Sequence, residues 1–222
     1  MSVLGDSALQ ALIDRLQARS VAQEAGTQAY FSERAKRGEL SWDGLDADAN
    51  RFMADKMVAL EPAKAELCHL LCLSLRAQRV VEIGTSFGVS TLYLAAALRA
   101  LGGGVVIGTE YEPAKAAAAR AHFAQAGLAD LIDLREGDLR ETLKVIEGPV
   151  DFVLMDIWTE MARPALELVA PSLRSGAMIV ADNTIQARPG YRQFFEFVED
   201  PANGLKTLTL PYEGGLELVV KV

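Results

Sequence analysis

Hydrophobic positions along the chain first follow a helical spacing and then a strand spacing, and the change comes well before the middle of the chain. In residues 6–37, leucine and isoleucine recur at helical intervals, and a second, more polar helical stretch ends near Gly38. The acidic, turn-rich segment 39–50 predicts a loop. A helix is expected from Pro62, a residue that fits the first turn of a helix, to Ala77.

From there to the end, short apolar runs alternate with longer amphipathic stretches, and glycines and prolines separate them. The apolar runs have the character of buried parallel strands and lie at 79–83, 105–109, 131–135, 151–155 and 177–181. Helices are expected at 89–101, 113–126, 139–147, 161–173 and near 190–199. The last two apolar runs, LKTLTL and LELVVKV, flank the short glycine loop PYEGG and therefore predict a β-hairpin.

This order of elements predicts a doubly wound α/β fold. Strands that alternate with helices form a parallel sheet, and the terminal hairpin adds an antiparallel member, which gives a seven-stranded, mostly parallel, Rossmann-like sheet. Sheets of this type bind ligands outside the carboxyl ends of the strands, where the strand order reverses. No repeat or linker divides the chain, so we expect one domain over 1–222. Within it, 61–222 would be the core, and extra helices in 1–60 would form a cap or acceptor region.

Composition and charge narrow the range of partners. Half of the 222 residues are hydrophobic, but no apolar run reaches the ~18 residues that indicate a membrane span. A net charge of −8 and a pI near 4.9 argue against nucleic acid or an anionic membrane as the main partner. The N-terminus lacks the pattern of a secretory signal, and Cys68 and Cys72 are placed as core residues without zinc-binding partners. We therefore expect a protein of the reducing cytoplasm.

The stretch from Arg79 to Ala97, RVVEIGTSFGVSTLYLAAA, gives the clearest chemical signal. A β-branched strand ends in an acidic residue, a turn bracketed by Gly84 and Gly88 follows, and an apolar helix comes next. In such a unit the free N–H groups and the positive dipole end of the helix face a ligand, and the glycines let the backbone approach it. The stretch therefore predicts a nucleotide-type cofactor site.

Two interpretations of this turn fit poorly. A dinucleotide site needs glycines as G-x-G-x-x-G, and Ser86 stands where the middle glycine should lie. The same letters match the G-x-S-x-G nucleophile turn of hydrolases, whose histidine follows the serine and the acid in the chain. The only histidines are His69, which precedes the serine, and His122, which lies in a helical run too early in the chain. The hydrolase interpretation therefore has no base.

A third interpretation fits without a gap. Glu82, Gly84 and Gly88 resemble the first motif, E-x-G-x-x-x-G, of class I methyltransferases, which bind S-adenosylmethionine. In that family an acidic residue at the end of the second strand holds the ribose, and Glu110 ends the strand VVIGTE here. A carboxylate at this point can accept hydrogen bonds from both ribose hydroxyls.

From Met57 to the C-terminus the chain is similar to the cation-dependent O-methyltransferases, which include catechol and caffeoyl-CoA O-methyltransferases and small bacterial relatives. In that family, a methionine like Met57 lies near the reactive end of the cofactor, and a serine like Ser90 contacts its methionine carboxylate. A tryptophan like Trp158 packs on the adenine. The resemblance implies that S-adenosylmethionine contacts Met57, Glu82, Gly84, Ser86, Gly88, Ser90, Glu110, Tyr111, Gly137, Asp138, Leu139, Asp156 and Trp158.

A metal site is suggested by the ends of the fourth and fifth strands. Asp156 ends DFVLMD, and Asp182 and Asn183 end MIVADN. Adjacent strands lie ~4.8 Å apart, so these side chains can converge on one ion. Two carboxylates and an amide oxygen suit Mg²⁺ or Ca²⁺. The ion would bind the acceptor and lower the pKa of its hydroxyl, which makes Asp156 and Asp182 the candidate catalytic residues. The alternative is that each aspartate only caps the following turn. Spacing alone does not decide between the two, and the family resemblance favours the metal.

One position departs from the family pattern. The family has a lysine, credited with deprotonating the hydroxyl, three residues after the strand-four aspartate, and Thr159 occupies that position here. Threonine is no base of useful pKa, so the metal alone would activate the hydroxyl, or Glu160 or Asp182 would help. We expect methyl transfer to a hydroxyl of a small, aromatic acceptor, by a homodimer. The open alternatives are a metal-independent methyltransferase that acts on another nucleophile and a catalytically degenerate protein that binds S-adenosylmethionine.

Overall fold

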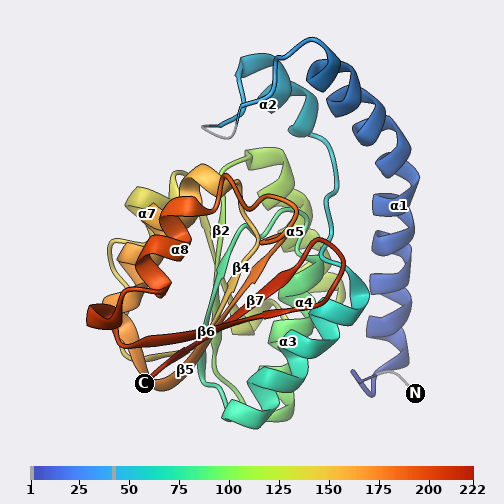
Figure 1. Ribbon diagram of the computed structural model, residues 1–222. Coiled ribbons are helices and arrows are strands. Elements are labelled where there is room, and N and C mark those ends of the chain that lie inside the picture. Colours follow the sequence, from blue (N-terminus) through green and yellow to red (C-terminus); the bar gives the residue numbers. More distant parts are fainter. Residues whose placement is uncertain (1–2, 42–43) are drawn as a thin grey trace.

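Figure 1 shows the computed structural model of the protein, which describes residues 3–41 and 44–222. One sheet is formed by the strands β1 (Arg79–Ile83), β2 (Val105–Glu110), β3 (Ile132–Glu136), β4 (Val150–Met155), β5 (Leu173–Asp182), β6 (Leu205–Leu210) and β7 (Leu216–Lys221). Their order is β3-β2-β1-β4-β5-β7-β6. Only β7 runs opposite to the other strands of this sheet, antiparallel to β5 and β6. The predicted fold class is therefore confirmed.

The strand order reverses between β1 and β4, which are parallel neighbours. After β1 the chain moves toward the β3 edge of the sheet, to β2, and after β4 it moves toward the β6 edge, to β5. The two connections therefore lead in opposite directions from the carboxyl ends of β1 and β4. Ligands of open α/β sheets bind at such a point, and the glycine turn and Asp156 both lie there.

Helices cover both faces of the sheet (Figure 1). One face packs against α3 (Pro62–Leu75), α4 (Val89–Ala100) and α5 (Pro113–Gln125), and the other against α6 (Leu139–Thr142), α7 (Thr159–Val169) and α8 (Arg192–Val198). Successive side chains of a strand point to opposite faces. In β1, accordingly, Val80 joins the core under α3 and α4, while Val81 joins the core under α7 and α8. Short 3-10 helices lie at Ala129–Leu131, Ala170–Ser172 and Pro201–Asn203.

The N-terminal region begins with one long helix, α1 (Ser7–Lys36), where the sequence predicted two successive helical stretches. No proline interrupts it, and the Asp6 carboxylate caps it by accepting hydrogen bonds from the N–H groups of Ala8 and Leu9. Its first half packs on the core through the predicted leucines and isoleucine, and its second half projects past the end of the sheet in Figure 1. Among the helices of the described residues, none has the length and apolar character needed to cross a membrane.

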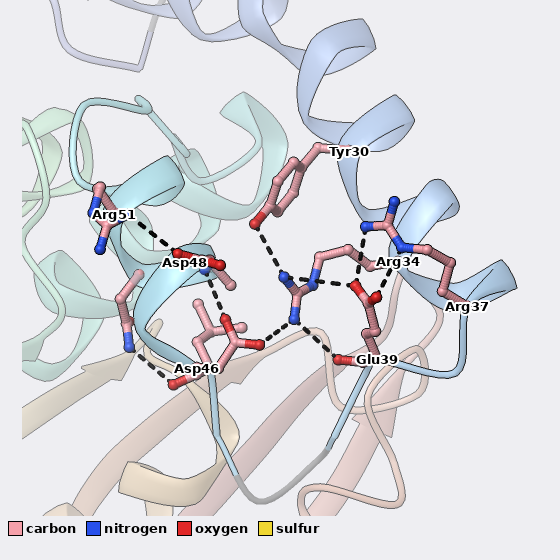
Figure 2. Close-up of polar contacts among 10 residues, drawn as sticks. Tyr30, Arg34, Arg37, Glu39, Asp46, Asp48 and Arg51 are labelled. Atoms are coloured by element: carbon pink, nitrogen blue, oxygen red, sulfur yellow. Dashed lines mark hydrogen bonds and ion pairs between the residues drawn. The ribbon is translucent and has the colours of Figure 1, made fainter.

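The segment 39–50, predicted as a loop, contains the start of a second helix, α2 (Ala47–Met53), which Asp46 caps. Figure 2 shows how a largely buried Arg34 near the end of α1 holds this segment. Its guanidinium donates to the carbonyl of Glu39 at 3.2 Å and pairs with the Asp46 carboxylate. Glu39 and Asp46 are therefore both fixed to α1 by a charged hydrogen-bond network.

The prediction of a helix over 139–147 was too long, because α6 ends at Thr142. The guanidinium of Arg135 on β3 donates to the carbonyls of Thr142 and Val145, at 2.8 and 2.7 Å. Carbonyl groups at a helix end need such partners when the helix does not continue. Arg135 therefore stabilises an irregular segment in place of further helical turns.

The boundary between α7 and β5 also differs from the prediction. The helix was expected over 161–173, but it ends at Val169 and a 3-10 turn containing Pro171 follows. Proline lacks the N–H that would continue an α-helix. As a result β5 starts at Leu173, earlier than the predicted 177–181, and pairs with β4 from there.

Candidate active site at the carboxyl ends of the strands

The turn after β1 has a backbone that requires glycine at two positions. Gly84 has a φ of 96°, and a Cβ there would lie 2.0 Å from the backbone oxygen of Asp156. Gly88 has a φ of 84°, and a Cβ there would lie 2.4 Å from the ring of Phe123. Gly88 is also the N-cap of α4, so the free N–H groups at the start of that helix open onto the turn. This is the local geometry that a nucleotide-type ligand needs.

Glu82 lies fully buried beneath this turn. Its carboxylate accepts hydrogen bonds from the hydroxyls of Thr85 at 2.8 Å, of Ser90 at 2.7 Å, and of Thr91. Burial raises the pKa of Glu82, and the three hydroxyl donors lower it in part. Glu82 therefore fixes the turn to the first residues of α4, and the oxygen of Ser90 can still accept a hydrogen bond from a ligand.

Glu110, at the end of β2, borders the same turn. One carboxylate oxygen accepts from the N–H of Ser86 at 2.7 Å, and the other accepts from the N–H of Glu112 at 2.7 Å. Each oxygen has a second acceptor position that could receive a ligand hydroxyl. The Ser86 hydroxyl is buried and has no hydrogen-bond partner among the described residues. A buried hydroxyl without a partner is costly, and because Ser86 also lines the cleft, this hydroxyl is available to a ligand.

A narrow cleft joins the turn to residues from other elements. The structure brings Met57, Gly84, Ser86, Ser90 and Asp156 of the predicted cofactor set together along its walls. The complete lining is Met57, Val58, Ala59, Leu60, Gly84, Thr85, Ser86, Phe87, Val89, Ser90 and Asp156. Met57 is buried, and it comes from the irregular segment between α2 and α3.

The remaining predicted cofactor residues lie outside this lining. Tyr111 and Trp158 are exposed, at 70% and 43% of their surface, so both rings are free to cover a ligand. Asp138 caps α6 and forms an ion pair with Arg140 at 2.6 Å, and this hydrogen-bonded pair lowers the pKa of Asp138 to about 2. Gly137, with a φ of 123°, and the buried Leu139 flank Asp138.

The two histidines have no contact with the serine of the glycine turn. His69 Nδ1 lies 2.9 Å from the carbonyl oxygen of Tyr93, and His122 Nδ1 lies 2.9 Å from that of Phe87. Neither ring is placed to take a proton from Ser86. The geometry therefore gives no support to a hydrolase.

The three predicted metal ligands lie at the ends of β4 and β5. The Asp156 carboxylate has no hydrogen-bond partner in the described part of the chain. Burial raises the pKa of Asp156 to about 8, and the nearby charges of Asp182 and Glu82 add to the effect. Asp182 accepts from Lys64 Nζ at 2.7 Å on one oxygen and from Asn183 Nδ2 at 3.0 Å on the other.

Two carboxylates and an amide are the ligand types that suit a divalent cation of the hard-oxygen type, but here the Lys64 ammonium already pairs with one oxygen of Asp182. The carboxylate of Asp156 forms no ion pair within the described ranges and lies near that of Asp182, so a Mg²⁺ or Ca²⁺ ion bound there would stabilise its ionised form. Asn183, with a φ of 58°, presents its amide nitrogen to Asp182, and rotation of that amide would turn its oxygen toward Asp182 instead. The described residues contain no group of three His, Cys, Asp or Glu side chains that could hold a metal. A cation at this point would therefore have at most two carboxylates and an amide as side-chain ligands from these residues.

Sequence reasoning missed a buried cation, Lys64, in the first turns of α3. It is 3% exposed, and its Nζ donates to Asp182 and to the carbonyl of Glu213, each at 2.7 Å. It therefore ties α3 and the loop between β6 and β7 to the end of β5. One signal could have found it: Lys64, Cys68 and Cys72 are four residues apart and so lie on one helix face, which the cysteines indicated to be buried.

Thr159, which stands where the family lysine was expected, has a packing role. A Cβ on Gly190 would lie 2.4 Å from Thr159 Oγ1. The threonine side chain thus lies against the backbone of the loop before α8. The ammonium group of this site comes from Lys64, on a different element.

Comparison with known proteins agrees with this geometry. Residues 81–184 match the model of a methyltransferase domain family. The chain is 35% identical over 131 residues to a catechol O-methyltransferase of Mycobacterium tuberculosis, and the aligned part covers 58% of each chain. It is 33% identical over 154 residues to the catechol O-methyltransferase of Niastella koreensis, over 65% of this chain and 67% of the relative. The chain belongs to this O-methyltransferase family.

A solved member of the O-methyltransferases supports the assignment. The structure of TomG from Streptomyces achromogenes, in complex with S-adenosylmethionine, superposes with a TM-score of 0.69 at 25% identity. The superposition covers 79% of this chain and 87% of TomG. The range matched by the family model contains the glycine turn and the candidate metal ligands, whereas Met57 and Lys64 precede it. The family model thus matches the part of the chain from β1 to β5. The helical region before it adds Met57 to the cleft and Lys64 to the contacts of Asp182.

Proposed function

We propose that the protein is an S-adenosylmethionine-dependent O-methyltransferase that acts on a hydroxyl of a small, aromatic acceptor with help from a divalent cation. The observation on which this rests is the cleft after β1, whose lining includes both Ser86, with its unpartnered hydroxyl, and Asp156, with its unpaired carboxylate. Glu110 stands beside this cleft through its hydrogen bond to Ser86. A ligand whose hydroxyl groups face Glu110 and whose reactive centre lies near Asp156 suits this arrangement.

The chain itself supplies binding and alignment. When bound, S-adenosylmethionine supplies an already activated methyl group. Glu110 would hold the ribose hydroxyls, and the N–H groups at the start of α4 would face the polar end of the cofactor. Held at Asp156, Asp182 and Asn183, a divalent cation would favour the ionised form of the acceptor hydroxyl. The chain would thus contribute mainly proximity and orientation to an in-line displacement.

The surroundings of the site support an aromatic acceptor. Trp158 after β4, Ile185 after β5 and Val58 before α3 are large apolar side chains that are 43%, 56% and 53% exposed. Trp158 and Ile185 follow the carboxyl ends of β4 and β5, and Val58 lies in the segment that lines the cleft before α3. Apolar side chains exposed around a polar centre suit a flat ring with hydroxyl groups.

One observation favours a second candidate, a metal-independent methyltransferase. Lys64 already places a positive charge on Asp182. An acceptor could then be positioned by the Asp182–Lys64 pair without an added ion.

The experiment that tests these proposals measures binding and turnover separately. Calorimetry with S-adenosylhomocysteine tests the cofactor, and binding of NAD(H) in its place would refute it. Turnover of S-adenosylmethionine with catechols and hydroxycinnamoyl thioesters, with Mg²⁺ or with EDTA, tests the reaction. Asp182→Ala, at a candidate metal ligand outside the lining of the cofactor cleft, should abolish Mg²⁺-dependent turnover and leave cofactor affinity nearly intact. EDTA-insensitive turnover would favour the second candidate.

We also propose a homodimer of single-domain chains in the cytoplasm. Val21 and Leu40, on α1 and just after it, are apolar side chains that are 60% and 48% exposed and could pack against a second copy. Light scattering should give twice the chain mass, and a monomer would refute the dimer. The free, buried Cys68 and Cys72 suit a reducing compartment. Cell fractionation tests the compartment, and a single calorimetric unfolding transition tests the single domain.

A further inference from the structure

The segment from Met57 to Leu60 forms one wall of the cofactor cleft and has no regular secondary structure. Met57 and Leu60 are 3% and 2% exposed. Backbone N–H and C=O groups in such a buried, irregular segment need hydrogen-bond partners from elsewhere.

Those partners come from α1. The Met57 N–H donates to Gln23 Oε1 at 2.7 Å, and the Met57 carbonyl accepts from the Ser20 hydroxyl at 2.8 Å. The Ser20 oxygen also accepts from the Ala59 N–H at 3.1 Å. One turn earlier on the helix, Gln17 Nε2 donates to the Leu60 carbonyl at 2.9 Å. These three side chains are three residues apart and therefore share one face of the helix.

The same turns of α1 also touch the opposite wall of the cleft. The guanidinium of Arg19 lies over the ring of Phe87, 4.9 Å from its centroid. Phe87 belongs to the glycine turn and lines the cleft. A cation–π contact of this kind contributes modestly to stability but fixes the relative position of its partners. One stretch of α1 thus touches both walls that would enclose the cofactor.

We propose that α1 is part of the cofactor-binding machinery, with Gln23 and Ser20 as positioning residues that hold the Met57 segment against the glycine turn. The inference rests on the proposed function, because it assumes that S-adenosylmethionine occupies this cleft. It gives the N-terminal helix a role in holding the cofactor, beyond its expected role as an acceptor cap. Docking of α1 and occupancy of the cleft are then coupled, so that each stabilises the other.

Calorimetry with S-adenosylhomocysteine on the full chain tests this. Gln23→Ala removes the acceptor of the Met57 N–H and should raise the Kd roughly three- to tenfold, the effect of one lost hydrogen bond. Gln23→Glu keeps a side-chain oxygen there and should restore most of the affinity. Gln28→Ala, an exposed glutamine on the same helix, is the matched control and should leave the Kd within about twofold. In turnover, Gln23→Ala should raise the KM for S-adenosylmethionine more than it lowers kcat.

Hydrogen exchange on the wild type gives a second readout that needs no variant. S-adenosylhomocysteine should protect the amides of 57–60 and of the α1 turns at 17–24, as well as those of the glycine turn. Protection confined to the glycine turn, or an unchanged Kd in Gln23→Ala, would overturn the inference. If the wild type binds no S-adenosylhomocysteine, the proposed function itself is wrong. The two failures are therefore distinguishable.

Discussion

Replacing Lys64 with methionine tests whether the buried ion pair holds the site together. Lys64 and Asp182 are 3% and 6% exposed, so the substitution leaves a buried carboxylate with only Asn183 as hydrogen-bond donor. Removing one partner of a buried pair costs about 3–5 kcal/mol of unfolding free energy, because the other charge stays desolvated. The lost hydrogen bond to the Glu213 carbonyl adds to that cost.

Urea unfolding at pH 7 in EDTA measures this loss. Lys144→Met is the matched control, since Lys144 pairs with Glu141 on the surface, where the side chains are 57% and 68% exposed. That pair should contribute less than about 1 kcal/mol. The double variant Lys64→Met/Asp182→Asn removes the unpaired charge and should recover part of the loss. If Lys64→Met is within about 1 kcal/mol of the Lys144 control, the pair does not stabilise the site and the reasoning is wrong.

Three further perturbations follow from the contacts described. Glu110→Ala should weaken S-adenosylhomocysteine binding by about 1.5–3 kcal/mol in calorimetry; an unchanged Kd would remove Glu110 from the cofactor site. Gly84→Ala should abolish that binding or prevent folding, since its Cβ would lie 2.0 Å from the Asp156 oxygen, and a folded variant of normal affinity would contradict the steric argument. Burial works to raise the pKa of Asp151, but hydrogen bonds from Arg174 and from two backbone N–H groups lower it below its usual value. Asp151 should therefore stabilise the fold above the unfolded-state pKa of about 4 and lose this effect as the pH falls through its lower folded value. Asp151→Asn should cost about 1.5–3 kcal/mol at pH 7, with the difference shrinking below pH 4 in acid-unfolding curves; a pH-independent difference would contradict it.

The centre of the sheet could be predicted from the sequence because strands such as β1 and β4 are buried on both faces. An apolar run such as β1 is bounded by polar or glycine residues at each end, so the predicted 79–83 is also the observed range. The glycine turn could be predicted for a similar reason, since its backbone conformation depends on residues that are adjacent in the chain.

The features that the sequence did not reveal depend on partners distant in the chain. The length of α6 depends on Arg135 of β3, whose side chain binds the carbonyls beyond Thr142. Lys64 pairs with an aspartate 118 positions away, and no local pattern announces such a pair. The bonds from α1 to the Met57 segment likewise join residues 34–43 positions apart. The polar contacts between residues distant in the chain are therefore known only from the structure.

The contact between Thr159 and Gly190 limits how this site can change in evolution. The space beside Gly190 is filled by the threonine side chain, so no residue larger than glycine fits there while residue 159 has its present conformation. A lineage that gains a lysine at 159 must also reshape the loop at 190, and the two positions should vary together among related sequences. The positive charge that Lys64 brings to Asp182 from α3 would then be retained, because moving it to position 159 would require changes at two positions.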